Sequence, residues 1–418
     1  MQDSRNSDRG DNLAIKVETV RGYVLEELLA RLLQDNGYRL LVAADQDREA
    51  LKDSGRGLLV RGRGTDHQVD VLGELDRPLP FSLPLRLFVE AKHRSDRTGI
   101  EFARNAYGTI RDVNEYYGTQ TPGAYHIPMK RYQYQYALFS ASGFTKPAQE
   151  YALAQQISLI DLSNPGFDAL LAAADDIATR IVDLAAQVGL ASLPLNQVRH
   201  ALRHALGTWP ANVDDEDFPD LAAHVRQMRG HAGESAFPAP AFGLAVAYDR
   251  EQAGLNVAQL RDEPGDEYYV YEEDVSPPRK LPTGQLTAIV TGLGEVALDD
   301  FVLGFPPAPF VLVLLVDNPA AFTEYVDNSR NTDIRVNLNY PRDRRDNRPL
   351  SRDWEIEPVD GEAGFRLSFT LPTILADWML GGEVPTWSLR EAKTTLLSSI
   401  AMVRGNRVVR LLYQPHRG

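Results

Sequence analysis

The feature that most constrains the fold is an eight-residue stretch, residues 85–92 (LRLFVEAK), in which apolar side chains alternate with larger or charged ones. Successive side chains of a strand point to opposite faces of the sheet, so this stretch has one wholly apolar face. Its other face carries Arg86, Phe88, Glu90 and Lys92. We therefore predict a strand that packs on a hydrophobic core and holds Glu90 and Lys92 side by side.

The segments around this strand predict an α/β sheet with helices on its faces. Residues 16–36 have apolar side chains at helical spacing and end at Asn36-Gly37, so they form the first helix. Two further helices are expected at residues 100–117 and 147–155, the second capped by Thr145. Residues 55–64, rich in Gly and Arg, are expected to form a loop or the approach to a strand. The remaining strands are expected at residues 38–43, 68–72, 134–140 and 157–162.

The composition changes after residue 165, which predicts four segments. Residues 1–14 are expected to be a disordered tail, and residues 15–165 form the α/β domain. Residues 166–240 are expected to be a helical connector, broken near residues 189–194, followed by an acidic linker. Residues 241–418 are expected to form an α+β domain, with strands at 242–248, 310–316, 334–340, 365–370 and 407–413 and a helix near 389–403.

Composition narrows the class of protein. The chain has no cysteine, which excludes disulfides, thiol catalysis and thiolate metal sites. No run approaches the roughly 20 apolar residues of a membrane helix, and the polar N-terminus resembles neither a signal peptide nor an anchor. We expect a cytoplasmic protein that does not contact a membrane.

The net charge of −14 lies entirely in the second part of the chain. Residues 1–150 contain 21 Lys and Arg against 21 Asp and Glu, and the acidic excess lies in stretches such as 214–220, 262–267 and 272–274. A neutral domain with clustered arginines can still bind phosphates. The acidic region offers a docking face for a protein partner and would discourage non-specific DNA binding.

Asp70 and the run Glu90-Ala91-Lys92 form the strongest candidate site. Two carboxylates on adjacent strands can hold Mg²⁺, for which Mn²⁺ can substitute, and the Ala91 carbonyl can add a backbone ligand. The ammonium of Lys92 then lies beside an attacking water, as phosphodiester hydrolysis requires. The simpler alternative is a solvated strand face with an ion pair.

Four segments of residues 16–165 resemble Mrr-type restriction endonucleases of the PD-(D/E)XK nuclease superfamily, in the same order and spacing. They are residues 23–38 (YVLEELLARLLQDNGY), 64–73 (GTDHQVDVLG), 87–94 (LFVEAKHR) and 137–162 (ALFSASGFTKPAQEYALAQQISLIDL). The resemblance implies a restriction-endonuclease-like core with a mixed sheet flanked by helices. It also implies that Asp70 and Glu90 bind metal beside Lys92. Mrr proteins themselves tend to have Gln in the position of Glu90.

The family also implies an acidic residue on the first helix near the metal, and this sequence offers Glu26 and Glu27. The centre of the apolar stripe lies about 110° from Glu26 and about 150° from Glu27 around the helix. Glu26 therefore borders the buried face and is the candidate for orienting a metal-bound water, whereas Glu27 is expected to point to water.

Several other residues are weaker candidates. Gln68 shares a strand face with Asp70 and is a candidate for contacting nucleic acid. His67 has the opposite parity and is expected to be structural, and no HExxH spacing supports zinc. Tyrosines such as Tyr136 are expected in the core or stacked on bases. The candidate phosphate contacts beyond the lysine are Arg94, Arg97 and Arg104.

The leading functional prediction is a Mg²⁺-dependent DNA endonuclease in restriction or antiphage defence, acting as a homodimer. One alternative is a regulatory or scaffolding subunit of a defence complex that needs a partner for activity, and an RNA nuclease is another.

Overall fold

The structure is a computed structural model. The residues that it describes are 15–54, 57–75, 82–117, 130–209, 280–308, 310–328, 332–339, 353–359, 363–380, 391, 393–404 and 407–413. The predicted tail at residues 1–14, the acidic stretches and the predicted strand at 242–248 lie outside these ranges. No helix among the described residues is long and apolar enough to cross a membrane.

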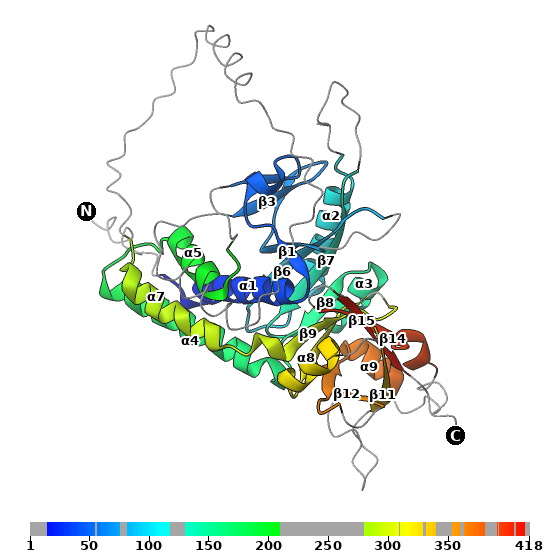
Figure 1. Ribbon diagram of the computed structural model, residues 1–418. Coiled ribbons are helices and arrows are strands. Elements are labelled where there is room, and N and C mark those ends of the chain that lie inside the picture. Colours follow the sequence, from blue (N-terminus) through cyan, green and yellow to red (C-terminus); the bar gives the residue numbers. More distant parts are fainter. Residues whose placement is uncertain are drawn as a thin grey trace, which may run out of the picture.

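A five-stranded mixed sheet forms the centre of the N-terminal half (Figure 1), so the fold is mixed α/β as predicted. Its strand order is β1-β5-β6-β7-β8, antiparallel from β1 to β6 and parallel from β6 to β8. The strand predicted from the alternation at 85–92 has the predicted bounds. The strands are β1 (Tyr38–Leu40), β5 (Val71–Leu75), β6 (Leu85–Lys92), β7 (Gln133–Ser140) and β8 (Ser158–Asp161).

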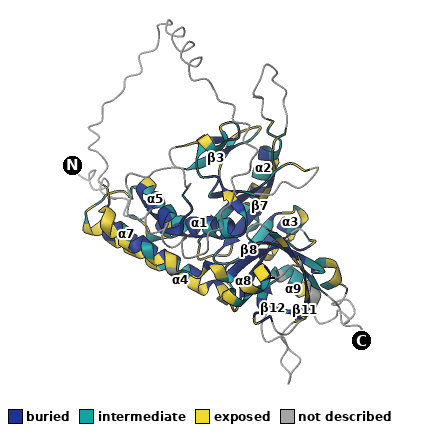
Figure 2. Cartoon of the chain, viewed as in Figure 1, coloured by how far each residue is buried: buried dark blue, intermediate teal, exposed yellow. Residues whose placement is uncertain are grey.

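Helices cover both faces of this sheet. Helix α1 (Val17–Asp35) packs with Leu87 and Val89 on one face. Helices α2 (Ile100–Asn114) and α3 (Lys146–Ala154) pack with Phe88 on the other. Thr145 caps α3 as predicted, because its side chain accepts a hydrogen bond from the Ala148 N–H. Figure 2 shows the buried residues concentrated where the sheet meets these helices.

A three-stranded sheet lies at the end of the molecule next to α2 (Figure 1) and was only partly predicted. It consists of β2 (Leu51–Asp53), β3 (Leu58–Arg61) and β4 (Asp66–Gln68). Residues 55–64 were expected to be a loop or the approach to a strand, and residues 58–61 of this range are themselves the strand β3, which pairs with β2 and β4. The single strand expected at 68–72 is wrong, since the chain leaves β4 after Gln68 and enters β5 at Val71.

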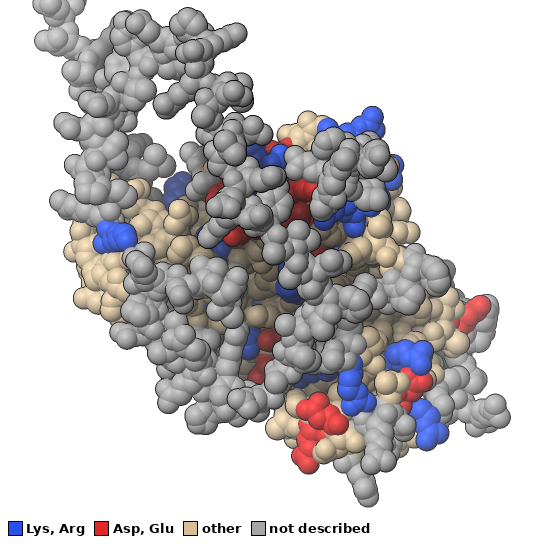
Figure 3. Space-filling model, turned by 45° about the horizontal axis from the view of Figure 1, so that its top comes forward, with Lys and Arg blue, Asp and Glu red and all other residues tan. Residues whose placement is uncertain are grey.

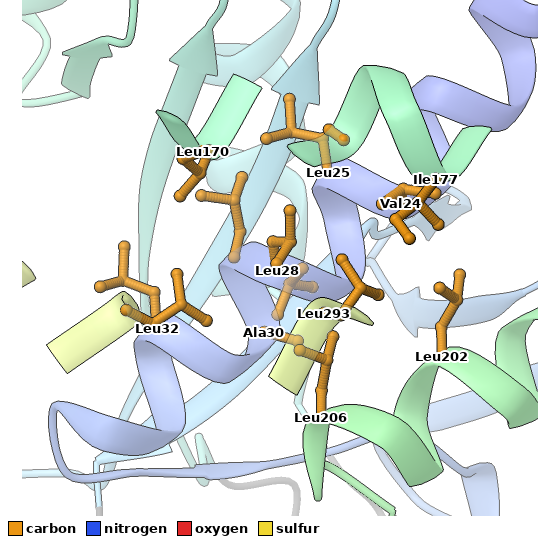
Figure 4. Close-up of a cluster of buried hydrophobic side chains, with 14 of the residues drawn as sticks. Val24, Leu25, Leu28, Ala30, Leu32, Leu170, Ile177, Leu202, Leu206 and Leu293 are labelled. Carbon is orange, nitrogen blue, oxygen red and sulfur yellow. The ribbon is translucent and has the colours of Figure 1, made fainter. Parts of the chain in front are cut away.

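Three helices enclose α1 on its side away from the sheet. Helices α4 (Asp168–Gln187) and α5 (Leu195–Leu206) pack directly on α1, and α7 (Thr283–Thr291) packs on both of them. Figure 4 shows leucine and isoleucine side chains of α1, α4 and α5 meeting at Leu293, in the 3-10 turn that follows α7. Residues beyond 280 thus belong to the same core as the first helix. The short 3-10 turns are η1 (Ala44–Asp47), η2 (Pro165–Phe167), η3 (Gly292–Glu295) and η4 (Leu298–Asp300).

A seven-stranded sheet with the order β14-β15-β11-β12-β13-β10-β9 forms the C-terminal part. Residues 399–403, expected within a helix, are instead in a strand, because they pair along their whole length with the last strand of the chain. The elements are β9 (Phe301–Gly304), β10 (Leu312–Val316), α8 (Pro319–Asn328), β11 (Asp333–Asn339), β12 (Asp353–Pro358), β13 (Leu367–Thr370), α9 (Thr373–Leu380), β14 (Ser399–Arg404) and β15 (Arg407–Tyr413).

Candidate active site

The candidate site lies where β5 and β6 separate. The antiparallel pairing of these strands ends at Val71 opposite Val89. Beyond that pair, Oδ2 of Asp70 replaces a backbone carbonyl of the neighbouring strand as the acceptor and accepts a 2.8 Å hydrogen bond from the Ala91 N–H. The N–H and C=O of one strand residue point to the same edge, so the Ala91 carbonyl faces this gap as well.

Glu90 and Lys92 lie on one face of β6, as their alternation predicts. Their side chains form an ion pair, and each is 23% exposed. The hydroxyl of Tyr136, on β7, donates a hydrogen bond to Oε2 of Glu90. Burial, followed by the charge of Glu90, raises the pKa of Tyr136, so its phenol keeps its proton at neutral pH. Glu90 is thus held in place from its own strand and from the next.

Glu26, on α1, lies near Asp70. Its carboxylate accepts a hydrogen bond from Nη2 of Arg199, which lies on α5. Burial raises the pKa of Glu26 to about 8, and the negative charge of Asp70 adds to that effect while Arg199 opposes it. The structure therefore brings Glu26 close enough to Asp70 for their charges to interact.

The expectation that Glu27 points to water is wrong. Glu27 is only 3% exposed, and both of its carboxylate oxygens accept hydrogen bonds of 3.0 Å from Nε of Arg203. The helical-stripe argument assumed that α1 has a solvent face. Helices α4 and α5 cover that face, so α1 is buried nearly all round.

Acidic and basic groups both act on Asp70. Burial raises the pKa of Asp70, and Glu90 raises it further, whereas the Ala91 N–H, Lys92 and Arg199 lower it. Within the part of the chain that the structure describes, no group of three or more His, Asp or Glu side chains is placed to hold a metal ion. Mg²⁺ commonly takes only one or two carboxylates and completes its shell with water and phosphate oxygens. Asp70, Glu90 and the Ala91 carbonyl fit that donor chemistry.

The other candidates are divided between two regions. Gln68 is exposed at the end of β4, where its Nε2 lies beside Gly57 together with Nη1 of Arg199. Arg94 lies over the ring of Phe102, 5.2 Å from its centre, and Lys92 lies 5.6 Å from the same ring. Gln68 and Arg94 thus border the site.

Arg97 and Arg104 lie elsewhere. Arg97 lines a cavity between β8 and the C-terminal sheet, whose other wall includes Phe369 and Leu371. Arg104 is exposed on α2, and its guanidinium lies over Tyr151 of α3. No contact recorded among the described residues joins either arginine to Asp70 or Glu90.

His67 anchors the three-stranded sheet to α2, in keeping with its expected structural role. Its Nε2 lies 2.8 Å from Oδ2 of Asp112, which also accepts a hydrogen bond from the Thr65 N–H. Figure 3 shows acidic side chains interspersed with basic ones over the end of the molecule that carries this sheet and α2.

Sequence reasoning missed two residues of the site. Tyr136 lies in the core, which was one of the two expectations for it, but its hydrogen bond to Glu90 was not predicted because it depends on the register of β7 against β6. Arg199 lies outside the segments that resemble a nuclease. Arg199 and Arg203 are four residues apart on an amphipathic helix, so the sequence does show that they share one face. It does not show that this face packs against the two neighbouring glutamates of α1.

Comparisons with known proteins add little to this geometry. No protein-family model and no curated protein matches the chain. One similar solved structure is the crystal structure of the protein of unknown function AF1548. The match covers 50% of this chain and 98% of that chain, with 17% sequence identity and a TM-score of 0.25. At this level of similarity the match says nothing about activity.

Proposed function

We propose that this protein is a Mg²⁺-dependent endonuclease that hydrolyses DNA phosphodiester bonds. The observation that carries the proposal is the gap between β5 and β6, where Asp70 binds the backbone N–H between Glu90 and Lys92. Two carboxylates, a free strand edge and a lysine meet there, and a third carboxylate, Glu26, approaches from α1. This is the set of groups that metal-assisted phosphodiester hydrolysis needs.

The finer fold assignment supports the same function. We infer that α1 and the five-stranded sheet form a restriction-endonuclease-like core, as the resemblance to Mrr-type enzymes implies. The order of elements fits that core: a helix, three antiparallel strands, a helix and two further parallel strands separated by α3. Asp70, Glu90 and Lys92 lie at the point where its second and third strands, β5 and β6, separate.

Each residue has a distinct role in the proposed reaction. Asp70, Glu90 and the Ala91 carbonyl would hold Mg²⁺, which neutralises charge on the phosphate and lowers the pKa of bound water. Lys92 positions the attacking water and takes part in its deprotonation. Tyr136 fixes the orientation of Glu90 through its hydroxyl. Glu26 accepts a hydrogen bond from a water in the site once it is ionised.

Asp70→Ala tests the function directly. We expect the variant to fold but to lose cleavage of a supercoiled plasmid in Mg²⁺ by at least about a thousandfold, because the metal loses a ligand. Asp66→Ala is the matched control, since Asp66 forms a surface ion pair with Lys52 and lies outside the site. An Asp70→Ala variant that cuts as fast as the parent would show that the assignment is wrong.

The same assay separates the remaining alternatives. A nuclease-fold regulatory or scaffolding subunit would not nick DNA with or without Mg²⁺ until a partner is added. Methylated, unmethylated and single-stranded DNA, together with RNA, test the proposed role in restriction or antiphage defence and the choice of nucleic acid. We also propose a homodimer, because two active sites can cut both strands in one encounter, and its mass in solution tests this.

A further inference from the structure

Helix α5 contributes a positive charge to the candidate active site. Arg199 donates a hydrogen bond from Nη2 to Glu26, and its charge also acts on Asp70. Its guanidinium lies over the ring of Tyr23, 4.8 Å from the ring centre. Only 11% of its side chain is exposed. Arg199 is therefore held against α1, with its charge beside the proposed metal ligands.

Most of the hydrogen-bond donors of Arg199 are unused. A guanidinium has five N–H groups, and in the described part of the chain only those on Nη2 have a hydrogen-bond acceptor. Nε is buried without a partner. Nη1 lies beside Gly57, 3.4 Å from where a Cβ would stand on that residue, and the Gln68 amide lies 3.6 Å from the same point. Because the surrounding protein encloses Nε, the donor that is left for a ligand oxygen is Nη1, beside Gly57 and Gln68.

Arg203, one turn further along α5, forms a buried ion pair with Glu27 that serves as a comparison. Its Nε donates to both oxygens of Glu27, whose side chain is almost fully buried. That carboxylate is fully engaged with its arginine and lies on the enclosed side of α1. Arg199 differs because its Nε is buried without a partner and because its charge acts on Asp70.

We propose that Arg199 binds a non-bridging oxygen of the scissile phosphodiester beside the Asp70–Glu90 centre. This inference rests on the proposed nuclease function. The carboxylates of Asp70 and Glu90 repel a phosphate, and a fixed cation nearby offsets that repulsion before any metal binds. Arginine suits this role because its planar donors match phosphate oxygens in geometry. The active site would then be completed by a helix that follows the nuclease-like segment.

Metal-free DNA binding by the full chain tests the proposal. The probe is a fluorescein-labelled duplex in EDTA, with fluorescence anisotropy measured over a range of salt concentrations. The variants are Arg199→Gln, Glu26→Gln, the double variant and Arg180→Gln. Arg180 is the control, because it is an exposed arginine of α4 whose ion pair, within the described ranges, is with Asp176 of its own helix. Thermal unfolding checks that every variant is folded.

We expect Arg199→Gln and the double variant to weaken duplex binding roughly tenfold. The slope of the salt dependence should fall by about 1 in both, as for the loss of one phosphate contact. Glu26→Gln and Arg180→Gln should keep the slope of the parent. The double variant matters because Arg199→Gln alone leaves the buried Glu26 carboxyl group without its hydrogen-bond donor.

Two outcomes would overturn the proposal. Binding of the parent's strength and salt slope in the double variant would mean that Arg199 serves only to neutralise Glu26. Unchanged binding by Arg199→Gln would exclude a phosphate contact altogether. If the parent cuts DNA and Asp70→Ala does not, such results refute the role of Arg199 alone. A parent that neither binds nor cuts DNA refutes the nuclease function as well.

Discussion

Glu26 is the residue whose protonation the fold changes most clearly. Its pKa is about 8 in the folded protein, against an ordinary value of 4.5, because α1 is buried at this point and Asp70 lies nearby. Between those two pH values the unfolded chain releases a proton that the folded protein keeps. The contribution of Glu26 to the free energy of unfolding is therefore largest below about pH 4.5. It falls as the pH rises and is smallest above about pH 8.

This residue gives a prediction about stability against pH. Glu26→Gln should remove a decline in the free energy of unfolding that amounts to at most about 5 kcal/mol between pH 5 and pH 8. Urea unfolding at several pH values measures it. Glu18→Gln is the control, because Glu18 is exposed on the same helix and should leave the decline unchanged. If Glu26→Gln retains the decline of the parent, then Glu26 does not titrate in this range.

At the scale of one element, strand β6 is anchored at its start by a buried arginine. Arg86 is 1% exposed and donates hydrogen bonds to Glu74, Asp47 and the hydroxyl of Tyr134. Its guanidinium also lies 3.3 Å above the ring of Tyr132. This network fixes β6 at the end opposite Glu90 and Lys92. One end of β6 is thus anchored by this network, and the other end carries the candidate site.

Removing this anchor should destabilise the fold without changing the site chemistry. Arg86→Met removes the buried cation from Asp47 and Glu74 and leaves each with a more exposed arginine, which costs about 3–5 kcal/mol of the free energy of unfolding. Arg39→Met is the matched control: Arg39 pairs with the same Glu74 but is 51% exposed, so its loss should cost about 1 kcal/mol or less. Equal losses in urea unfolding would contradict the structural role assigned to Arg86.

At the scale of the whole molecule, the N-terminal half is not complete without residues beyond 280. The Leu303 N–H donates to Oδ1 of Asn36 at 2.7 Å, and Gln197 exchanges two hydrogen bonds with the backbone of Leu281. Leu286 of α7 is fully buried in the same hydrophobic cluster as α1. The helix that carries Arg199 is therefore supported from the far end of the chain.

We predict that Leu286→Ala weakens the N-terminal half as well as its own surroundings. A fully buried leucine lost from a core costs about 2–5 kcal/mol. Hydrogen exchange should show faster exchange in α1 and α5, which pack on the same cluster. Val408→Ala is a control, because Val408 is exposed on β15. Faster exchange confined to residues beyond 280 would mean that the two halves are stable independently.

The sequence by itself determined β1, β6, β7 and β8 of the five-stranded sheet and the pairing of Glu90 with Lys92. Both follow from local periodicity, since a strand of alternating residues can place these two side chains only on one face. The break at Asp70 and the three-stranded sheet were not predictable, because short strands depend on their partners more than on their own residues.

Only the tertiary structure decided which groups Glu26, Glu27, Tyr136 and Arg199 contact. Their surroundings come from segments far away in the chain, and a helical-stripe argument cannot tell whether a second layer of helices covers the polar side. Arg199 lies 173 residues from the glutamate that it binds, so its place in the site depends on the packing of α5 against α1. That packing depends on hydrophobic contacts summed over many residues, which no local pattern records.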